Sequence, residues 1–149
     1  MIHYPDTSFL CSIYRAQAHS LEAVRFRSTM GEPVYYTELL EFEFLHSLRF
    51  QAWRFSRDYS QGFTSHEADA ITANWKTDIA TGNNVLVPCN MNEVIRLSKS
   101  LALQYTEQYG HRPFDMLHVA TALHLDAKKF LTFDNNQRIL AQHVGLKTS

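Results

Sequence analysis

Residues 113–134 read PFDMLHVATALHLDAKKFLTFD and join a predicted helix to a predicted strand. Apolar residues at helical spacing place the helix over Phe114–Leu125, and the compact run Lys129–Phe133 indicates the strand. A further helix is predicted over Asn135–His143. A helix that leads into a strand, and then into another helix, is typical of an α/β protein with parallel strands.

The same alternation runs through the rest of the chain. Further strands are predicted at 2–4, 33–36 and 85–87, with a last short one after Gly145, and further helices at 7–18, 20–30, 37–55, 65–79 and 92–109. Glycine and proline separate these segments, and no repeat, low-complexity tract or linker interrupts them. We therefore expect a single domain over residues 1–149, a three-layer α/β/α sandwich with a mostly parallel central sheet.

Composition excludes several classes of protein. The 149 residues carry 14 Lys and Arg against 15 Asp and Glu, and 45% are hydrophobic, so the chain is neither disordered nor a basic coat for nucleic acid. No stretch reaches the roughly 18 apolar residues of a membrane helix, and no secretory signal is expected at the start of the sequence. Widely spaced glycines exclude a Walker loop and a GxGxxG turn. Cys11 and Cys89 favour free thiols in a cytoplasmic protein over a disulfide framework or zinc site.

Three aspartates fall where predicted strands end or helices begin. Asp6 follows the first strand, Asp134 follows the strand over 129–133, and Asp115 lies in the first turn of the helix after Pro113. Ligand sites of parallel sheets lie at the carboxyl ends of the strands, so the three carboxylates are expected to converge there. The alternative for each is an ordinary helix cap or a favourable charge at a helix N-terminus.

A fourth acid is expected from the helix over 37–55, which is apolar on several sides. Its candidates are Glu38, Glu41 and Glu43. Glu43 lies on an apolar stripe, where a carboxylate is costly to bury unless it is paired or bound to metal. Periodicity does not decide among the three, because Glu41 also shares a face with leucines, and one or two of them can simply reach solvent.

Oxygen ligands without cysteine indicate a hard cation such as Mg²⁺ or Mn²⁺. No zinc HExxH motif exists, since His66-Glu67 is not followed by a second histidine at the required spacing. His118 lies one turn after Asp115 and is expected either to support the site or to pack in the core.

These residues resemble the motifs of PIN-domain ribonucleases, in particular the VapC-like toxins of type II toxin–antitoxin pairs. The opening YPDTS resembles the family's strand followed by Asp and Thr or Ser, and TELLEFEFLHSL resembles its acidic helix, in which the register selects Glu43. The most specific match is the carboxy-terminal block, which consists of DMLHVATA at 115–122, LTFDNNQRILA at 131–141 and VGL at 144–146.

The resemblance implies a PIN-like fold and a metal-dependent endoribonuclease. Asp6, Glu43, Asp115 and Asp134 would be the catalytic acids and would hold one or two Mg²⁺ or Mn²⁺ ions; a bound cation would also relieve their mutual repulsion. Ser8, Thr132 and His118 would support that site. The substrate would be RNA, single-stranded or in a loop.

The expected partners follow from the same resemblance. They are an antitoxin protein that inserts into the active-site groove and a second copy of the chain in a homodimer. The candidates for holding the RNA backbone are Arg15, Arg49, Arg54 and Arg112, each of which could instead be solvated or ion-paired. Three other functions stay open: a small-molecule phosphoesterase, a non-catalytic PIN-like binding module, and an α/β domain with unrelated chemistry.

Overall fold

The computed structural model describes residues 2–15 and 20–149, and it divides the chain into two compact units. Unit 1 consists of Met1–Phe9 with Val87–Ser149, and unit 2 is Leu10–Leu86. The single domain expected from the sequence stays a prediction. The predicted helix over 7–18 is present as α1 (Thr7–Tyr14), and residues 16–19 of that prediction lie outside the described residues.

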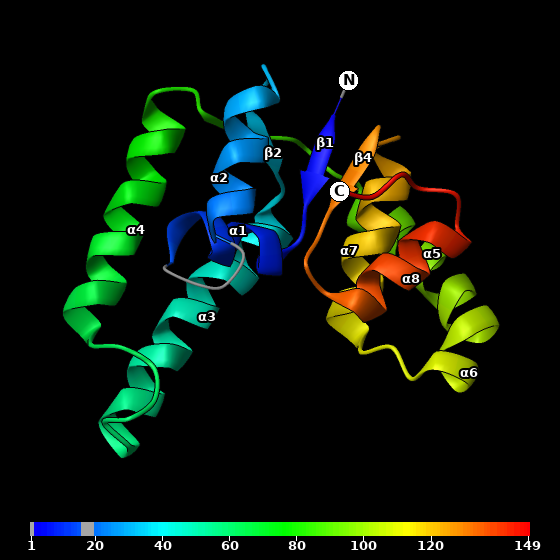
Figure 1. Ribbon diagram of the computed structural model, residues 1–149. Helices are drawn as coiled ribbons and strands as arrows, with labels where there is room; N and C mark the ends of the chain where they lie inside the picture. Colours follow the sequence, from blue (N-terminus) through cyan, green and yellow to red (C-terminus); the bar gives the residue numbers. More distant parts are fainter. Residues whose placement is uncertain (1, 16–19) are drawn as a thin grey trace. The chain divides into compact units, whose positions relative to one another are not determined.

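Unit 1 is built on two parallel strands (Figure 1). Strand β1 (His3–Pro5) pairs with β4 (Lys129–Leu131), so that Tyr4 lies opposite Phe130. Both of these rings are completely buried. A single parallel bridge from Phe130 to Thr148 is all that forms of the last strand predicted after Gly145.

Helices pack around this strand pair within unit 1. They are α5 (Met91–Leu101), the π-helix η1 (Ala102–Thr106), α6 (Glu107–Tyr109), α7 (Pro113–His124) and α8 (Asn135–His143). Helix α7 contacts both α5 and α8, and most of its residues are buried. Pro113 occupies its first turn, where a missing backbone N–H costs nothing.

Unit 2 has its own parallel pair, β2 (Val34–Tyr36) with β3 (Asn84–Leu86). Its helices are α2 (Ser20–Thr29), α3 (Glu38–Arg57) and α4 (Ser65–Ala80), besides most of α1. The core gathers around Trp75, whose ring contacts those of Tyr14, Tyr36 and Phe44. Thr37 caps α3 by accepting a hydrogen bond from the Leu40 N–H, which explains why this helix begins where the sequence predicts.

The strand predicted over 129–133 and the helix predicted over 92–109 differ from the structure in their detail. The strand over 129–133 ends at Leu131, because the Thr132 N–H donates to the Ser149 hydroxyl and the Phe133 N–H donates to the Ser8 hydroxyl, and neither pairs with a neighbouring strand. The helix predicted over 92–109 contains the π-helical turn η1, which helical periodicity does not reveal. No helix among residues 2–15 and 20–149 is long and apolar enough to cross a membrane.

The turn between α3 and α4 requires glycine at position 62. Gly62 has φ +65°, and a Cβ there would lie 2.1 Å from the backbone oxygen of Gln51. Gly31 has a similar φ of +68° but open space around it. We expect Gly62→Ala to lower the free energy of unfolding by about 3 kcal/mol and Gly31→Ala by about 1 kcal/mol, because only the first adds a clash to the strained backbone. Urea unfolding measures both, and equal losses would contradict the packing described for this turn.

Candidate active site

Asp6 is the most deeply buried acid of unit 1. It follows β1 directly, and its backbone N–H donates to the Leu131 carbonyl oxygen at 3.0 Å, which continues the pairing of β1 with β4. Its side chain has an exposed fraction of 0%. One carboxylate oxygen accepts from the Ser8 hydroxyl at 2.6 Å and from the Phe9 N–H at 2.9 Å, and the other accepts from the Thr132 hydroxyl.

Burial controls the protonation of Asp6. Desolvation raises its pKa from 3.8 to about 6, although the hydrogen bonds from Ser8, Thr132 and Phe9 and the nearby charge of His118 act in the opposite direction. A carboxyl group in this state gains from a cation beside it, because the positive charge compensates for the lost hydration. His118 on α7 is itself fully buried, so it is both a core histidine and an electrostatic neighbour of Asp6.

Two hydroxyl groups tie Asp6 to the segment after β4. Besides donating to Asp6, Ser8 accepts from the Phe133 N–H at 3.0 Å. Thr132 likewise accepts from the Asp134 N–H at 3.0 Å. Thr132 therefore connects Asp6 to Asp134, which the sequence predicted to lie at the same edge of the strands.

Asp134 is also the N-cap of α8. Its Oδ1 accepts from the Gln137 N–H at 3.0 Å, so Asp134 does cap this helix, and its role as a catalytic acid stays a prediction. Asp6 accepts a hydrogen bond of the same kind from the Phe9 N–H at the start of α1. Capping uses Oδ1 of Asp134 and leaves its Oδ2 directed elsewhere, 3.9 Å from the Arg112 guanidinium.

Asp115 completes the group of carboxylates in unit 1. It lies in the first turn of α7 with an exposed fraction of 6%, and its Oδ2 accepts from Nε of Arg112 at 3.1 Å. Arg112, which is 75% exposed in its side chain, thus bridges Asp115 and Asp134. Thr132 and Arg112 together join Asp6, Asp134 and Asp115 into one connected set of contacts.

The donor set of this cluster fits a hard divalent cation. The available ligands are carboxylate and hydroxyl oxygens, the atoms that Mg²⁺ and Mn²⁺ prefer. Within the described residues of unit 1, no three His, Cys, Asp or Glu side chains are already spaced as a coordination shell. Arg112 supplies the positive charge beside Asp115 and Asp134 in this arrangement.

The acids of α3 belong to unit 2 and differ in their surroundings. Glu38 is exposed in the first turn, and Glu41 accepts a hydrogen bond from Nε1 of Trp75 at 2.7 Å. Glu41 is therefore committed to the core of unit 2, a long-range contact that periodicity could not foresee. Glu43 is half-buried, and its choice as the fourth acid stays a prediction.

The candidate arginines of unit 2 have local partners. Arg15 lies over the ring of Phe63, at 5.2 Å from its centroid. Arg49 pairs with Asp69 at 2.8 Å, an exposed pair, and Arg54 donates to the side chains of Gln51 and Gln61. Arg112 is the candidate that lies beside the aspartates, and it is ion-paired with them, the alternative that the sequence left open for each arginine.

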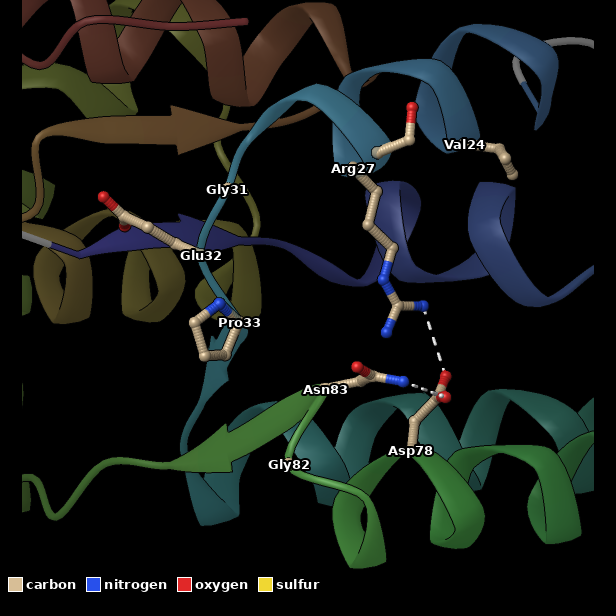
Figure 2. A pocket seen from close by; sticks show the side chains of 9 residues that line it. Val24, Arg27, Gly31, Glu32, Pro33, Asp78, Gly82 and Asn83 are labelled. Carbon is tan, nitrogen blue, oxygen red and sulfur yellow. Dashed lines mark hydrogen bonds and ion pairs between the residues drawn. The ribbon is translucent and has the colours of Figure 1, made fainter.

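Unit 2 contains a pocket of about 600 Å³, lined by residues of α2, α4 and the two loops that precede its strands. In Figure 2, Arg27 and Asn83 both point at Asp78. Arg27 donates to Asp78 at 3.2 Å and to Asn84 at 3.1 Å, and the Tyr14 hydroxyl also donates to Asp78. Burial is the main cause that raises the pKa of Tyr14 to about 12, and its hydrogen bond to Asp78 acts in the same direction. These polar and charged groups are bonded to one another, so we interpret them as a network that stabilises the wall of the pocket.

Comparison with known proteins gives one matching family model and several solved structures of similar fold. Residues 3–142 match the family model described as PIN domain. VapC20 of Mycobacterium tuberculosis, described as a sarcin–ricin loop cleaving toxin, superposes with a TM-score of 0.65 at 14% identity, over 96% of this chain and 95% of that one. FitAcB of Neisseria gonorrhoeae gives a TM-score of 0.66 at 15% identity, over 99% and 96%.

VapBC2 of Rickettsia felis, bound to a DNA fragment from its promoter, gives a TM-score of 0.64 at 12% identity, over 100% of this chain and 98% of that one. No curated protein matches the chain by sequence. At these identities the structural likeness concerns the fold, and it confirms the helical α/β architecture with parallel strands that the sequence predicted.

Proposed function

The chain belongs to the PIN-domain family, and we propose that it is a metal-dependent endoribonuclease, the toxin of a toxin–antitoxin pair. The observation that carries this proposal is the connected set of Asp6, Asp115 and Asp134 in unit 1. A fully buried carboxyl group linked to two further acids is costly for a protein to keep unless a cation neutralises it.

The residues proposed to hold Mg²⁺ or Mn²⁺ are Asp6, Asp115 and Asp134, with Glu43 of α3 as the fourth acid of a single PIN domain over residues 1–149. A divalent cation bound there would lower the pKa of a bound water molecule and would compensate for negative charge on the phosphate oxygens. Hydrolysis adds the elements of water across one P–O bond, so one product carries the phosphate and the other the new hydroxyl group.

The side chains around the acids have orienting roles in this proposal. Ser8 and Thr132 each donate to Asp6 and each accept a backbone N–H from the segment after β4, so the Asp6 carboxylate has little freedom to rotate. The cap bond from the Gln137 N–H fixes one oxygen of Asp134, and the other oxygen lies 3.9 Å from the Arg112 guanidinium. Positioning ligands in advance in this way reduces the reorganisation needed when substrate binds.

RNA, an antitoxin and a second copy of the chain are the proposed partners, and the cytoplasm is the proposed location. The proposal is supported by the family match and by the names of the structural neighbours, which include a sarcin–ricin loop cleaving toxin and VapBC2. Cleavage of single-stranded or loop RNA is favoured, because its bases are accessible to side chains.

Purified protein incubated with cellular RNA and Mn²⁺ tests the activity. We expect RNA fragments without 2′,3′-cyclic phosphate ends, because the phosphorus is attacked by water and not by the ribose 2′-hydroxyl group. Hydrolysis of a small phosphate monoester under the same conditions, with RNA left intact, would favour the phosphoesterase alternative. Intact RNA and intact ester would favour a non-catalytic binding module.

Arg112 and a metal ion compete for the same carboxylates in this account. Arg112→Ala is expected to tighten Mn²⁺ binding about fivefold, because the ion no longer displaces a guanidinium from Asp115 and Asp134. Titration calorimetry with Mn²⁺ measures the change. Arg96→Ala is the matched control, since Arg96 forms an ion pair of the same spacing with Glu93. Weaker or unchanged Mn²⁺ affinity in Arg112→Ala would contradict the competition.

A further inference from the structure

A second cavity, of about 320 Å³, lies in unit 1 next to the aspartates. Helix α5, the π-helix η1, the loop at His111 and the start of α7 contribute its lining. The walls are mainly apolar and include Ile95, Met116 and Leu117. Arg112 lines this cavity and also binds Asp115, so the cavity adjoins the proposed active site.

His111 gives the cavity an unusual polar group. Its exposed fraction is 7%, and neither ring nitrogen has a hydrogen-bond partner among the described residues. Burial lowers the pKa of this imidazole, so its neutral form, with one donor and one acceptor, dominates near pH 7. Leaving both groups unbonded is costly, and a ligand with complementary groups would recover that cost.

Two basic residues, Lys99 and Arg112, are among those that line the cavity, and both are exposed. Arg112 is also ion-paired with Asp115 and Asp134. None of the lining residues that the structure describes is acidic. An apolar interior below a basic rim suits a ligand with a flat apolar body and an attached anion.

We propose that this cavity binds a nucleobase of the RNA strand beside the bond that is cleaved, with Lys99 and Arg112 contacting the neighbouring phosphates. The inference rests on the proposed nuclease function and adds base preference to it. The base edge satisfies the nitrogens of His111, whereas an aliphatic side chain of a protein partner would leave them unbonded. The base faces pack against the apolar walls, where stacking and burial supply the affinity.

Ala102→Phe is the variant that fills the cavity, since Ala102 of η1 lines it. Leu103→Phe is the matched control, because Leu103 is the next residue, is 88% exposed and is not among the lining residues. His111→Phe keeps the ring and removes both nitrogens. Thermal unfolding of each full-length variant verifies that it is folded.

The substrates are short single-stranded RNAs of randomised sequence, and a matched set with one abasic nucleotide beside the cleaved bond. In the wild type and in Leu103→Phe we expect preference for one base at that position and an about tenfold fall in kcat/KM for the abasic RNA. In Ala102→Phe we expect a raised KM, no base preference and no further loss with the abasic RNA. In His111→Phe the base preference alone is expected to weaken.

Binding of the same RNAs, measured by fluorescence anisotropy without metal, separates this inference from the proposed function. Cleavage with no base preference, equal in Ala102→Phe and the wild type, would overturn the base site and leave the nuclease intact, even if the cavity accepted a protein side chain. Base-dependent binding without cleavage would support the base site and overturn the nuclease. A wild type that neither binds nor cleaves RNA would overturn both.

Discussion

Asp115→Asn is expected to lower kcat/KM for RNA cleavage about a thousandfold or more while the protein stays folded. The asparagine has the same shape, and its amide oxygen can still accept the hydrogen bond from Nε of Arg112. What it lacks is the negative charge that a divalent cation requires from this nearly buried position. Single-turnover cleavage rates with Mn²⁺, together with a Mn²⁺ titration, measure both effects.

Asp126→Asn is the matched control for that substitution. Asp126 is an exposed aspartate of unit 1 with φ +51°, a backbone conformation that asparagine adopts readily. Its substitution by asparagine removes the same charge at a position outside the site. We expect it to cleave RNA at the rate of the wild type. Asp115→Asn activity equal to that of Asp126→Asn would show that Asp115 has only a structural role.

Asp6→Asn is expected to abolish cleavage and, unlike most changes at a buried polar residue, to stabilise the metal-free protein at neutral pH. The amide oxygen can accept the bonds from Ser8 and Phe9, and the amide nitrogen can donate to the Thr132 hydroxyl. The substitution removes a charge that the buried site disfavours, which is why stability and activity should move in opposite directions.

The pH dependence fixes the sign of this effect. The pKa of Asp6 is raised from 3.8 to about 6 in the folded protein, so its protonated form is the one that burial favours. Its stabilising contribution is complete below about pH 4 and is lost as the pH rises through 6, a fall of about 3 kcal/mol in the free energy of unfolding. Asp6→Asn should lack this fall.

Urea unfolding in EDTA from pH 3.5 to 7.5 measures the difference between Asp6→Asn and the wild type. We expect the difference to grow through the window between about pH 4 and pH 6 and then level off. Mn²⁺ should stabilise the wild type selectively, because it binds the folded carboxylates. A difference that stays flat across this window would show that Asp6 is not held in the disfavoured charged state.

Local signals in the sequence predicted much of unit 1. Helix α8 has the bounds expected from its periodicity, and Asp134 precedes it as a cap. The placement of Asp6 and Asp134 at neighbouring strand ends followed from the topology of parallel strands alone. These features depend on short segments whose residue spacing is contained in the linear sequence.

Features that depend on distant pairs were not predictable in the same way. The Trp75–Glu41 hydrogen bond joins two helices, and nothing in the pattern of α3 distinguishes Glu41 from Glu43 without it. The bridging of Asp115 and Asp134 by Arg112 depends on how two helix starts meet in space. His111 similarly becomes informative only when its burial and missing partners are known.

The most direct test is cleavage of one end-labelled single-stranded RNA by the wild type and by Asp115→Asn, each with Mn²⁺ and with excess EDTA. The proposed nuclease should cut the RNA only as wild type with Mn²⁺ and should regain activity when Mn²⁺ is restored after chelation. Cleavage that persists both in EDTA and in Asp115→Asn would contradict a metal site built on these aspartates.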